Sequence, residues 1–211
     1  MKLRWIGGVV AASAMMLVLQ NTVAQATVLE SWENNLDGWT VQQGAYTPSF
    51  STTTGVTDGS YSLVLTGTAS PTYGQMLLSP FESSWTAILG SSTSLSLDIY
   101  TPPGSFGYFL QFDVDFNNAD IGFQSIDGYS YPATVIGSET TLTIPIPAGI
   151  AAGLAASSNP TQIAIQIGGG NSDGNETMYL DKLQVVPEPA TVTMLGLGVL
   201  GLVCVARRRV S

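Results

Sequence analysis

The sequence predicts an all-β domain built as a two-sheet sandwich, because three of its segments alternate strictly between apolar and polar residues. A period of two is typical of a strand with one buried and one solvent-facing side. The alternation runs over residues 93–100, 108–116 and 161–167. Short strands separated by Gly, Pro, Ser, Asn and Asp indicate two packed sheets. The residues expected to face the core are Leu95, Leu97, Ile99, Tyr108, Leu110, Phe112, Val114, Phe116, Ile163, Ile165 and Ile167.

Weaker strand patterns occupy much of the remaining domain. Two segments, 83–89 and 148–156, are each expected to form a short turn of helix, although Gly149 and Gly153 weaken the second. We find no internal repeat and no second domain. The weaker strand candidates are residues 28–33, 38–42, 61–66, 75–78, 120–125, 140–146 and 178–186.

The first 26 residues have the layout of a secretory signal peptide. Lys2 and Arg4 form a positive start, residues 6–19 are apolar, and Ala24 and Ala26 form an Ala-x-Ala cleavage site. We therefore expect cleavage after Ala26 and export of the rest of the chain. An uncleaved N-terminal anchor is the alternative.

The last 25 residues, 187–211, combine the features of a tail directed to the membrane. An uncharged apolar run over 191–206 would gain free energy by leaving water for hydrocarbon. Its length only just reaches what a bilayer core requires, so as a permanent transmembrane helix it is marginal. The basic residues after it resist translocation, which places the domain outside the cytoplasm. These residues are Arg207, Arg208 and Arg209.

A short motif of Pro187, Glu188 and Pro189 stands just before the apolar run. Motif, apolar helix and basic end follow one another in this order, and the layout closely resembles the PEP-CTERM family of sorting signals. The resemblance implies an exopolysaccharide-producing Gram-negative bacterium. It also implies an exosortase, a membrane transpeptidase-like enzyme, that cuts at or near the motif. A plain single-pass anchor is the alternative.

The domain between the targeting segments, residues 27–186, is strongly acidic. It has about 160 residues, enough for a sizeable core. Of the 15 acidic residues of the chain only Glu188 lies outside it, and Lys182 is its only cation, so its net charge is about −13. Such a surface repels nucleic acid, whose binding requires Lys and Arg. It suits a cation-rich exterior, where divalent ions can bind carboxylates.

The residue types that the chain lacks exclude several kinds of chemistry. It has no histidine, so Ser-His-Asp and Cys-His mechanisms and the usual zinc sites are impossible within it. Its only cysteine, Cys204, lies in the apolar tail. The domain therefore has no internal disulfide, and its stability must come from its core or from bound metal.

Three motifs spread along the domain carry a second resemblance. Residues 29–39 read LESWENNLDGW, residues 56–63 read VTDGSYSL, and residues 178–183 read MYLDKL. Their order resembles the jelly rolls of carbohydrate-binding modules and galactose-binding-like domains. The resemblance implies that the predicted sandwich is jelly-roll-like.

In this family a structural Ca²⁺ is often held by the first Glu, by backbone carbonyls of the second motif and by the last Asp. The resemblance implies Glu33, Asp58 or Gly59, and Asp181 as the corresponding residues. Two carboxylates brought together from the first and last strands would repel unless a cation lay between them, and Ca²⁺ takes six to eight oxygen ligands. The family usually has Asn where this chain has Lys182. The alternative is that Asp181 and Lys182 are edge charges and Glu33 is a loop residue.

The polar sides of the alternating strands suggest a candidate carbohydrate face. Asp113 and Asp115 share one side of a strand, with Asp98 beside them if the strands are neighbours. Paired acids can hydrolyse glycosides, but nothing in the sequence desolvates one of these two, so we expect a solvated face. A sugar-binding face, with Tyr100 or Trp85 stacking on a ring, is the other possibility. Its polar residues would be Asp98, Gln111, Asp113, Gln162 and Gln166.

Together these features predict an exported, non-catalytic protein of the cell surface or extracellular matrix, anchored in the membrane before processing. Its expected role is adhesion or exopolysaccharide association, with an exosortase as the processing partner. The resemblance implies a structural Ca²⁺ as its cofactor. One alternative is a polysaccharide hydrolase or lyase that uses only acids, Tyr and Lys182. Another is a purely structural surface protein without a ligand.

Overall fold

The computed structural model describes residues 25–42, 46–67, 75–105, 110–131, 136–169 and 176–187. They belong to one compact unit, Ala26–Pro187. Both sheets and the hydrophobic core described below lie inside this unit, so it can be produced and studied by itself. Residues 1–24 of the predicted signal peptide and the apolar segment 191–206 lie outside the described residues. Within the described ranges, no helix has the length and apolar character needed to cross a membrane.

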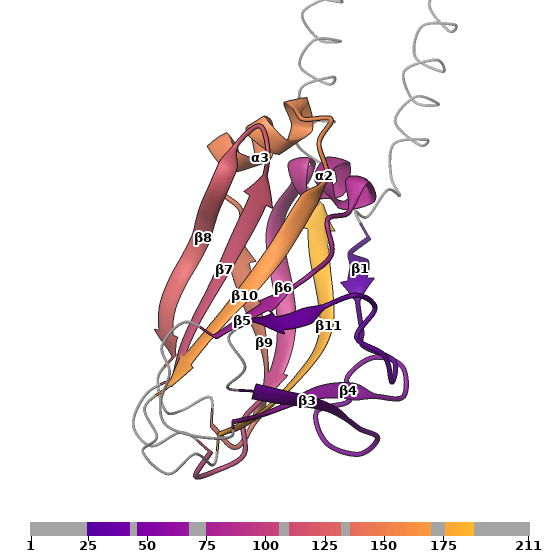
Figure 1. Ribbon diagram of the computed structural model, residues 1–211, viewed down its shortest axis with the longest axis vertical. Coiled ribbons are helices and arrows are strands. Elements are labelled where there is room, and N and C mark those ends of the chain that lie inside the picture. The colour runs from indigo at the N-terminus through magenta and orange to yellow at the C-terminus, as the bar shows by residue number, and fades with distance from the viewer. Residues whose placement is uncertain are drawn as a thin grey trace, which may run out of the picture. The chain divides into compact units, whose positions relative to one another are not determined.

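The domain is a sandwich of two antiparallel sheets, as the alternating segments predict (Figure 1). Sheet A has the strand order β3-β4-β11-β6-β9, and β1 also pairs with β11. Sheet B has the order β2-β5-β10-β7-β8. Sheet A contains β1 (Thr27–Glu30), β3 (Tyr46–Ser51), β4 (Ser62–Gly67), β6 (Ser92–Tyr100), β9 (Glu139–Pro145) and β11 (Thr177–Pro187). Sheet B contains β2 (Thr40–Gln42), β5 (Gln75–Leu78), β7 (Leu110–Asn118), β8 (Gly122–Tyr131) and β10 (Thr161–Gly169).

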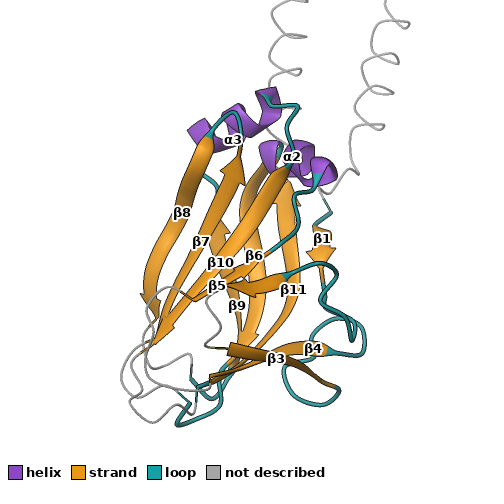
Figure 2. Ribbon diagram, in the orientation of Figure 1, coloured by secondary structure: helices purple, strands orange, loops and turns teal. Residues whose placement is uncertain are grey.

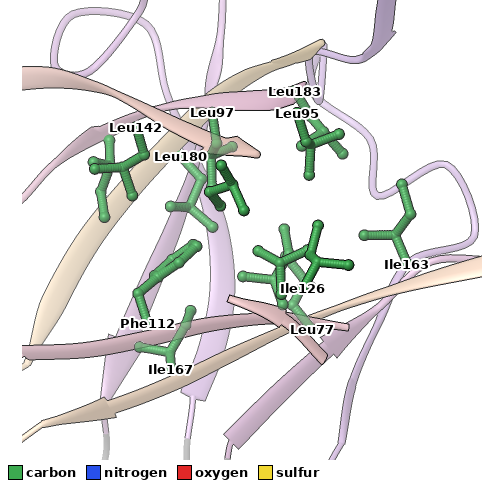
Figure 3. Packing of buried hydrophobic residues seen from close by; sticks show 14 of the residues in the cluster. Leu77, Leu95, Leu97, Phe112, Ile126, Leu142, Ile163, Ile167, Leu180 and Leu183 are labelled. Atoms are coloured by element: carbon green, nitrogen blue, oxygen red, sulfur yellow. The ribbon is translucent and has the colours of Figure 1, made fainter. Parts of the chain in front are cut away.

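The core fills the space between the two sheets with the apolar residues of the alternating strands (Figure 3). Leu95 and Leu97 of sheet A are fully buried, as are Ile163 and Ile165 of sheet B. Each such side chain contributes about 1.5 to 3 kcal/mol by leaving water. The predicted inward side of each alternating strand is therefore confirmed wherever the side chains are described.

Two short helices lie side by side at one end of the sandwich (Figure 2). They are α2 (Ser83–Gly90) and α3 (Ala148–Ala156), at the two segments where a turn of helix is predicted. The helices approach closely at Gly90, where an added Cβ would lie 2.5 Å from the backbone nitrogen of Ala155. A Cβ on Gly153 would lie 2.6 Å from Cγ2 of Ile121, so this glycine permits packing even though it weakens the helix.

Three strands differ most from the sequence prediction. β1 ends at Glu30, short of the predicted end at residue 33. β3 has no predicted counterpart, because Pro48 and small polar residues obscure its pattern. Proline is tolerated there because β3 lies at the edge of its sheet. β8 continues to Tyr131, beyond the predicted end at residue 125. A register shift interrupts its pairing with β7 between Val114 and Asp115, which breaks the period of two.

Candidate functional site

The residues implied as calcium ligands meet around one loop, residues 55–60, which leads into β4. Asp181 projects from β11 and is fully buried. Its Oδ2 accepts the backbone N–H groups of Thr57 at 2.6 Å and Asp58 at 2.8 Å, and its Oδ1 accepts the N–H of Lys182 at 2.7 Å. Burial raises the pKa of Asp181, and these backbone hydrogen bonds act in the opposite direction.

Glu33 binds the other end of the same loop. The backbone N–H of Ser60 donates to Oε1 of Glu33 at 3.1 Å and to Oε2 at 2.9 Å. Gly59 has a φ of +61°, and an added Cβ would lie 1.8 Å from Oε1 of Glu33. The loop therefore requires glycine here. The structure thus brings Glu33, Asp58, Gly59 and Asp181 together around one loop.

Asp98, predicted for a sugar face, instead belongs to this cluster. It lies opposite Asp181 in the register between β6 and β11. Oγ1 of Thr57 donates to Oδ2 of Asp98 at 2.7 Å and lies 3.2 Å from Oδ2 of Asp181. Thr141 of β9 donates to the other oxygen of Asp98. Thr57 was not predicted as a site residue, because a threonine in a turn carries no distinctive sequence signal.

The alternative reading of Asp181 and Lys182 as edge charges does not hold. β11 lies in the middle of sheet A, between β4 and β6. Lys182 has a φ of +48° next to an irregularity in the register between Asp181 and Gln184. Asn and Gly adopt this left-handed conformation more readily than Lys does, which explains why Asn suits this position in the resembling family. Glu33 is an exposed loop residue, as that alternative supposed.

The side chains as arranged do not form an evident calcium site. Ca²⁺ requires oxygen ligands, whereas the carboxylates of Glu33 and Asp181 receive N–H and O–H donors from residues 57–60 and 182. Over the ranges that the structure describes, no three acidic or Cys side chains gather closely enough to hold a metal. Calcium binding therefore stays a prediction from the resemblance.

The predicted sugar-binding residues divide between the two sheets. Asp98 and Tyr100 belong to β6 in sheet A, while Gln111 and Asp113 on β7 and Gln162 and Gln166 on β10 belong to sheet B. The grouping into one face was therefore wrong for the first pair, because β6 and β7 follow one another in sequence but lie in different sheets. Half-buried Tyr100 packs against Tyr179 with ring centroids 5.8 Å apart. Buried Trp85 packs against Trp39 in the core, so it is not a stacking platform.

The outer side of sheet B carries a row of amides beside an exposed ring. Gln162 of β10 lies opposite Asn117 of β7, which lies opposite Phe123 of β8. Nε2 of Gln162 donates to the carbonyl of Ser79 at 2.8 Å, and Nδ2 of Asn117 donates to Oε1 of Gln162 at 3.4 Å. Phe123 is 55% exposed. Asn117 continues the polar alternation of Asp113 and Asp115, so extending that pattern by one step would have found it.

Gln166 lies opposite Asp113 in the same register, and Gln111 lies opposite Gly168. These pairs extend the polar side of sheet B along β7 and β10. The four predicted residues of sheet B are therefore brought to neighbouring strands.

Asp113 and Asp115 form an acid pair on this side of sheet B. Oγ of Ser125 donates to Oδ1 of Asp113 at 2.8 Å. Asp115 is only 1% exposed, and its Oδ2 has no hydrogen-bond partner in the described part of the chain. Burial, with the nearby charge of Asp113, raises the pKa of Asp115 to about 6. The expectation that both acids are solvated was thus wrong for Asp115.

The predicted processing residues fall at the limits of the described chain. Ala26 and Pro187 are the first and last residues of the compact unit. Ala24, Glu188, Pro189, Arg207, Arg208 and Arg209 lie outside the described residues. Cleavage after Ala26 stays a prediction.

Comparison with known proteins identifies the tail and the fold. A PEP-CTERM protein-sorting motif matches residues 185–209. No curated protein gives a significant match. Among solved structures, one from a study of carbohydrate-binding modules of the β-sandwich superfamily and their promiscuous specificity has a TM-score of 0.57 and 17% identity, over 79% of this chain and 64% of that chain.

Two further structures have the same fold. The CBM27-1 module of Caldicellulosiruptor saccharolyticus, solved with mannohexaose, has a TM-score of 0.55 and 16% identity, over 79% of this chain and 99% of the module. An exo-β-agarase has a TM-score of 0.53 and 16% identity, over 77% of this chain and 25% of the agarase chain. This chain thus spans less than two thirds of the first structure and a quarter of the agarase. The chain carries a PEP-CTERM protein-sorting motif after a β-sandwich with the fold of carbohydrate-binding modules.

Proposed function

We propose that the protein is exported, processed by an exosortase and retained at the surface or in the extracellular matrix of a Gram-negative bacterium, where it associates with polysaccharide without catalysis. The sorting motif at residues 185–209 supports the export and the processing. The polysaccharide is proposed from the fold and from the outer side of sheet B. Adhesion or matrix structure would be the consequence of this binding.

The row of Gln162, Asn117 and Phe123 is the observation that carries the proposal. Amide groups donate and accept hydrogen bonds, which suits the hydroxyl groups of a sugar. An exposed aromatic ring offers an apolar face with a defined geometry, on which the C–H side of a sugar ring can pack. The three residues come from adjacent strands, so a rigid sheet holds the ring and the amides in fixed positions.

The acid pair does not favour the hydrolase alternative. A general acid must reach the oxygen that it protonates, but Asp115 is 1% exposed. Asp113 lies on the same strand two residues away, so both carboxylates leave the sheet on the same side. Hydrolysis by an acid pair requires both groups at the glycosidic bond, and buried Asp115 does not reach one.

Affinity electrophoresis of residues 26–187 in gels that contain neutral polysaccharides tests the proposal. We expect retardation by at least one polysaccharide, and its loss in Phe123→Ala and in Gln162→Ala. Phe81→Ala is the matched control, because Phe81 is exposed to 50% but lies outside the row. Reducing sugar released from the same polymers would contradict the non-catalytic role. If no polysaccharide changed the mobility of the domain, the proposal of polysaccharide binding would be wrong, and a purely structural surface protein would be the remaining alternative.

A further inference from the structure

We infer that residues 55–60 are fastened to sheet A by a clasp of N–H and O–H donors on the carboxylates of Asp98, Asp181 and Glu33, and that the clasp holds without a metal ion. This inference does not depend on polysaccharide binding. It concerns the place where the resemblance implies a calcium ion. There the N–H and O–H groups of the loop, in place of an ion, balance the charges of the carboxylates.

Backbone donors surround the carboxylate of Asp181. Oδ2 accepts the N–H groups of Thr57 and Asp58 and lies 3.2 Å from the hydroxyl oxygen of Thr57, while Oδ1 accepts the N–H of Lys182. Hydrogen bonds to an ionised acceptor are roughly twice as strong as neutral ones. The N–H dipoles also provide the positive potential that a buried carboxylate needs. The charge of Asp181 therefore has local compensation.

Thr57 separates two acids that would otherwise repel each other. Asp98 and Asp181 lie opposite each other on adjacent strands, where like charges destabilise a sheet. The hydroxyl of Thr57 lies between them, 2.7 Å from Asp98 and 3.2 Å from Asp181. Thr141 supplies the second donor to Asp98. One residue thus ties the loop to both strands.

The two ends of the loop are packed closely as well. An added Cβ on Gly55 would lie 2.5 Å from Cβ of Tyr179, so the backbone lies directly on the side chain of β11. At the other end, both oxygens of Glu33 accept the N–H of Ser60. The loop is therefore held at its beginning, its middle and its end.

A calcium ion would compete with this arrangement. The N–H groups of Thr57 and Asp58 point their hydrogens at the atom that would have to bind the ion. Coordination would require these peptide groups to turn away, so that carbonyl oxygens replace them. At Oδ2 of Asp181, ion binding therefore competes with the observed hydrogen bonds.

Amide hydrogen exchange and thermal unfolding of residues 26–187 test the inference, each in excess chelator and in millimolar CaCl₂. We expect the amides of Thr57, Asp58 and Ser60 to be protected in chelator and equally protected in calcium. The unfolding midpoint should be the same in both solutions. Thr57→Val keeps the backbone donors but removes the hydroxyl, and it should lower the midpoint equally in both. Thr52→Val, at an exposed position before the loop, is the matched control and should leave the midpoint unchanged.

Two results would overturn the inference. One is rapid exchange of these three amides in chelator with protection only in calcium. The other is a midpoint that rises by many degrees in calcium, as binding to the folded state alone requires, and that no longer rises in Asp181→Asn. If Asp181→Asn does not fold, the exchange data on the unmodified domain and on Thr57→Val still decide the question. Polysaccharide binding is measured separately, so failure of one proposal leaves the other intact.

Discussion

Replacing Asp115 by Asn should stabilise the domain at neutral and alkaline pH and leave it unchanged at acidic pH. Asp115 is 1% exposed, and one of its oxygens has no hydrogen-bond partner among the described residues. Its pKa rises from 3.8 to about 6 in the folded domain. The folded state therefore binds more protons than the unfolded state between these two values, so stability falls as the pH rises through that window.

The magnitude follows from the size of the shift. A shift of about 2 units corresponds to about 3 kcal/mol at most. Because protein groups around a buried charge relax and reduce its cost, we expect about 1 to 2 kcal/mol. Asn has nearly the same shape and no charge, so Asp115→Asn avoids this cost at every pH.

Urea unfolding of residues 26–187, followed by tryptophan fluorescence, measures the effect. The two proteins should have equal free energies of unfolding near pH 4, and the variant should gain about 1 to 2 kcal/mol near pH 8. Glu30 and Asp181 also have raised pKa values, so only the difference between the two proteins isolates Asp115. Exposed Glu139→Gln serves as the charge-matched control. A difference that is the same at both pH values, or an Asn variant that is less stable near pH 8, would refute the reasoning.

Three further predictions concern backbone geometry, each measured as a change in the free energy of unfolding. Lys182→Gly should stabilise the domain by about 1 kcal/mol by relieving a left-handed conformation, and a loss of stability would contradict this. Gly59→Ala should destabilise it by about 2 kcal/mol, because the positive φ is strained and the Glu33 carboxylate must move away from the N–H of Ser60. Gly104→Ala has the same φ sign in open space and should cost only about 1 kcal/mol. In α3, Gly149→Ala should stabilise by about 0.5 to 1 kcal/mol, while Gly153→Ala should destabilise because its Cβ meets a neighbouring isoleucine. If Gly59→Ala and Gly104→Ala, or Gly149→Ala and Gly153→Ala, changed the free energy of unfolding equally, the contacts around each glycine would not explain its effect.

Alternation along the chain predicts which side of a strand is buried, but not which strands are neighbours. The inward positions of β6, β7 and β10 follow from their period of two. Asp98 and Asp113 both lie on the polar side of an alternating strand, and the two strands are successive in the sequence. The chain crosses from one sheet to the other after β6, so these two residues lie on opposite sides of the sandwich. This crossing depends on packing of the whole domain, which a local pattern does not contain.

The alternating pattern also does not predict which residues on the outer side of a sheet are buried. Ala164 and Asp115 lie opposite each other on β10 and β7 at positions expected to be solvated, and both are buried. The candidate residues Glu33, Gly59 and Asp181 come from segments far apart in the sequence, so composition and spacing alone could not have placed them together. The family resemblance located the loop where they meet, but not the donors that bind them.

The position of β11 sets the order in which the domain can be completed. Among the described residues β11 is the last strand in sequence, yet it lies inside sheet A and joins β1 and β4 to β6. Until it arrives, β6 and β9 have no connection to β3 and β4 within that sheet, and β1 has no partner strand among the described residues. Folding of this exported domain must therefore wait for its C-terminal strand, which ends at Pro187, inside the sorting motif. A chain cut short before β11 loses the residues of the sorting motif and its complete sheet together.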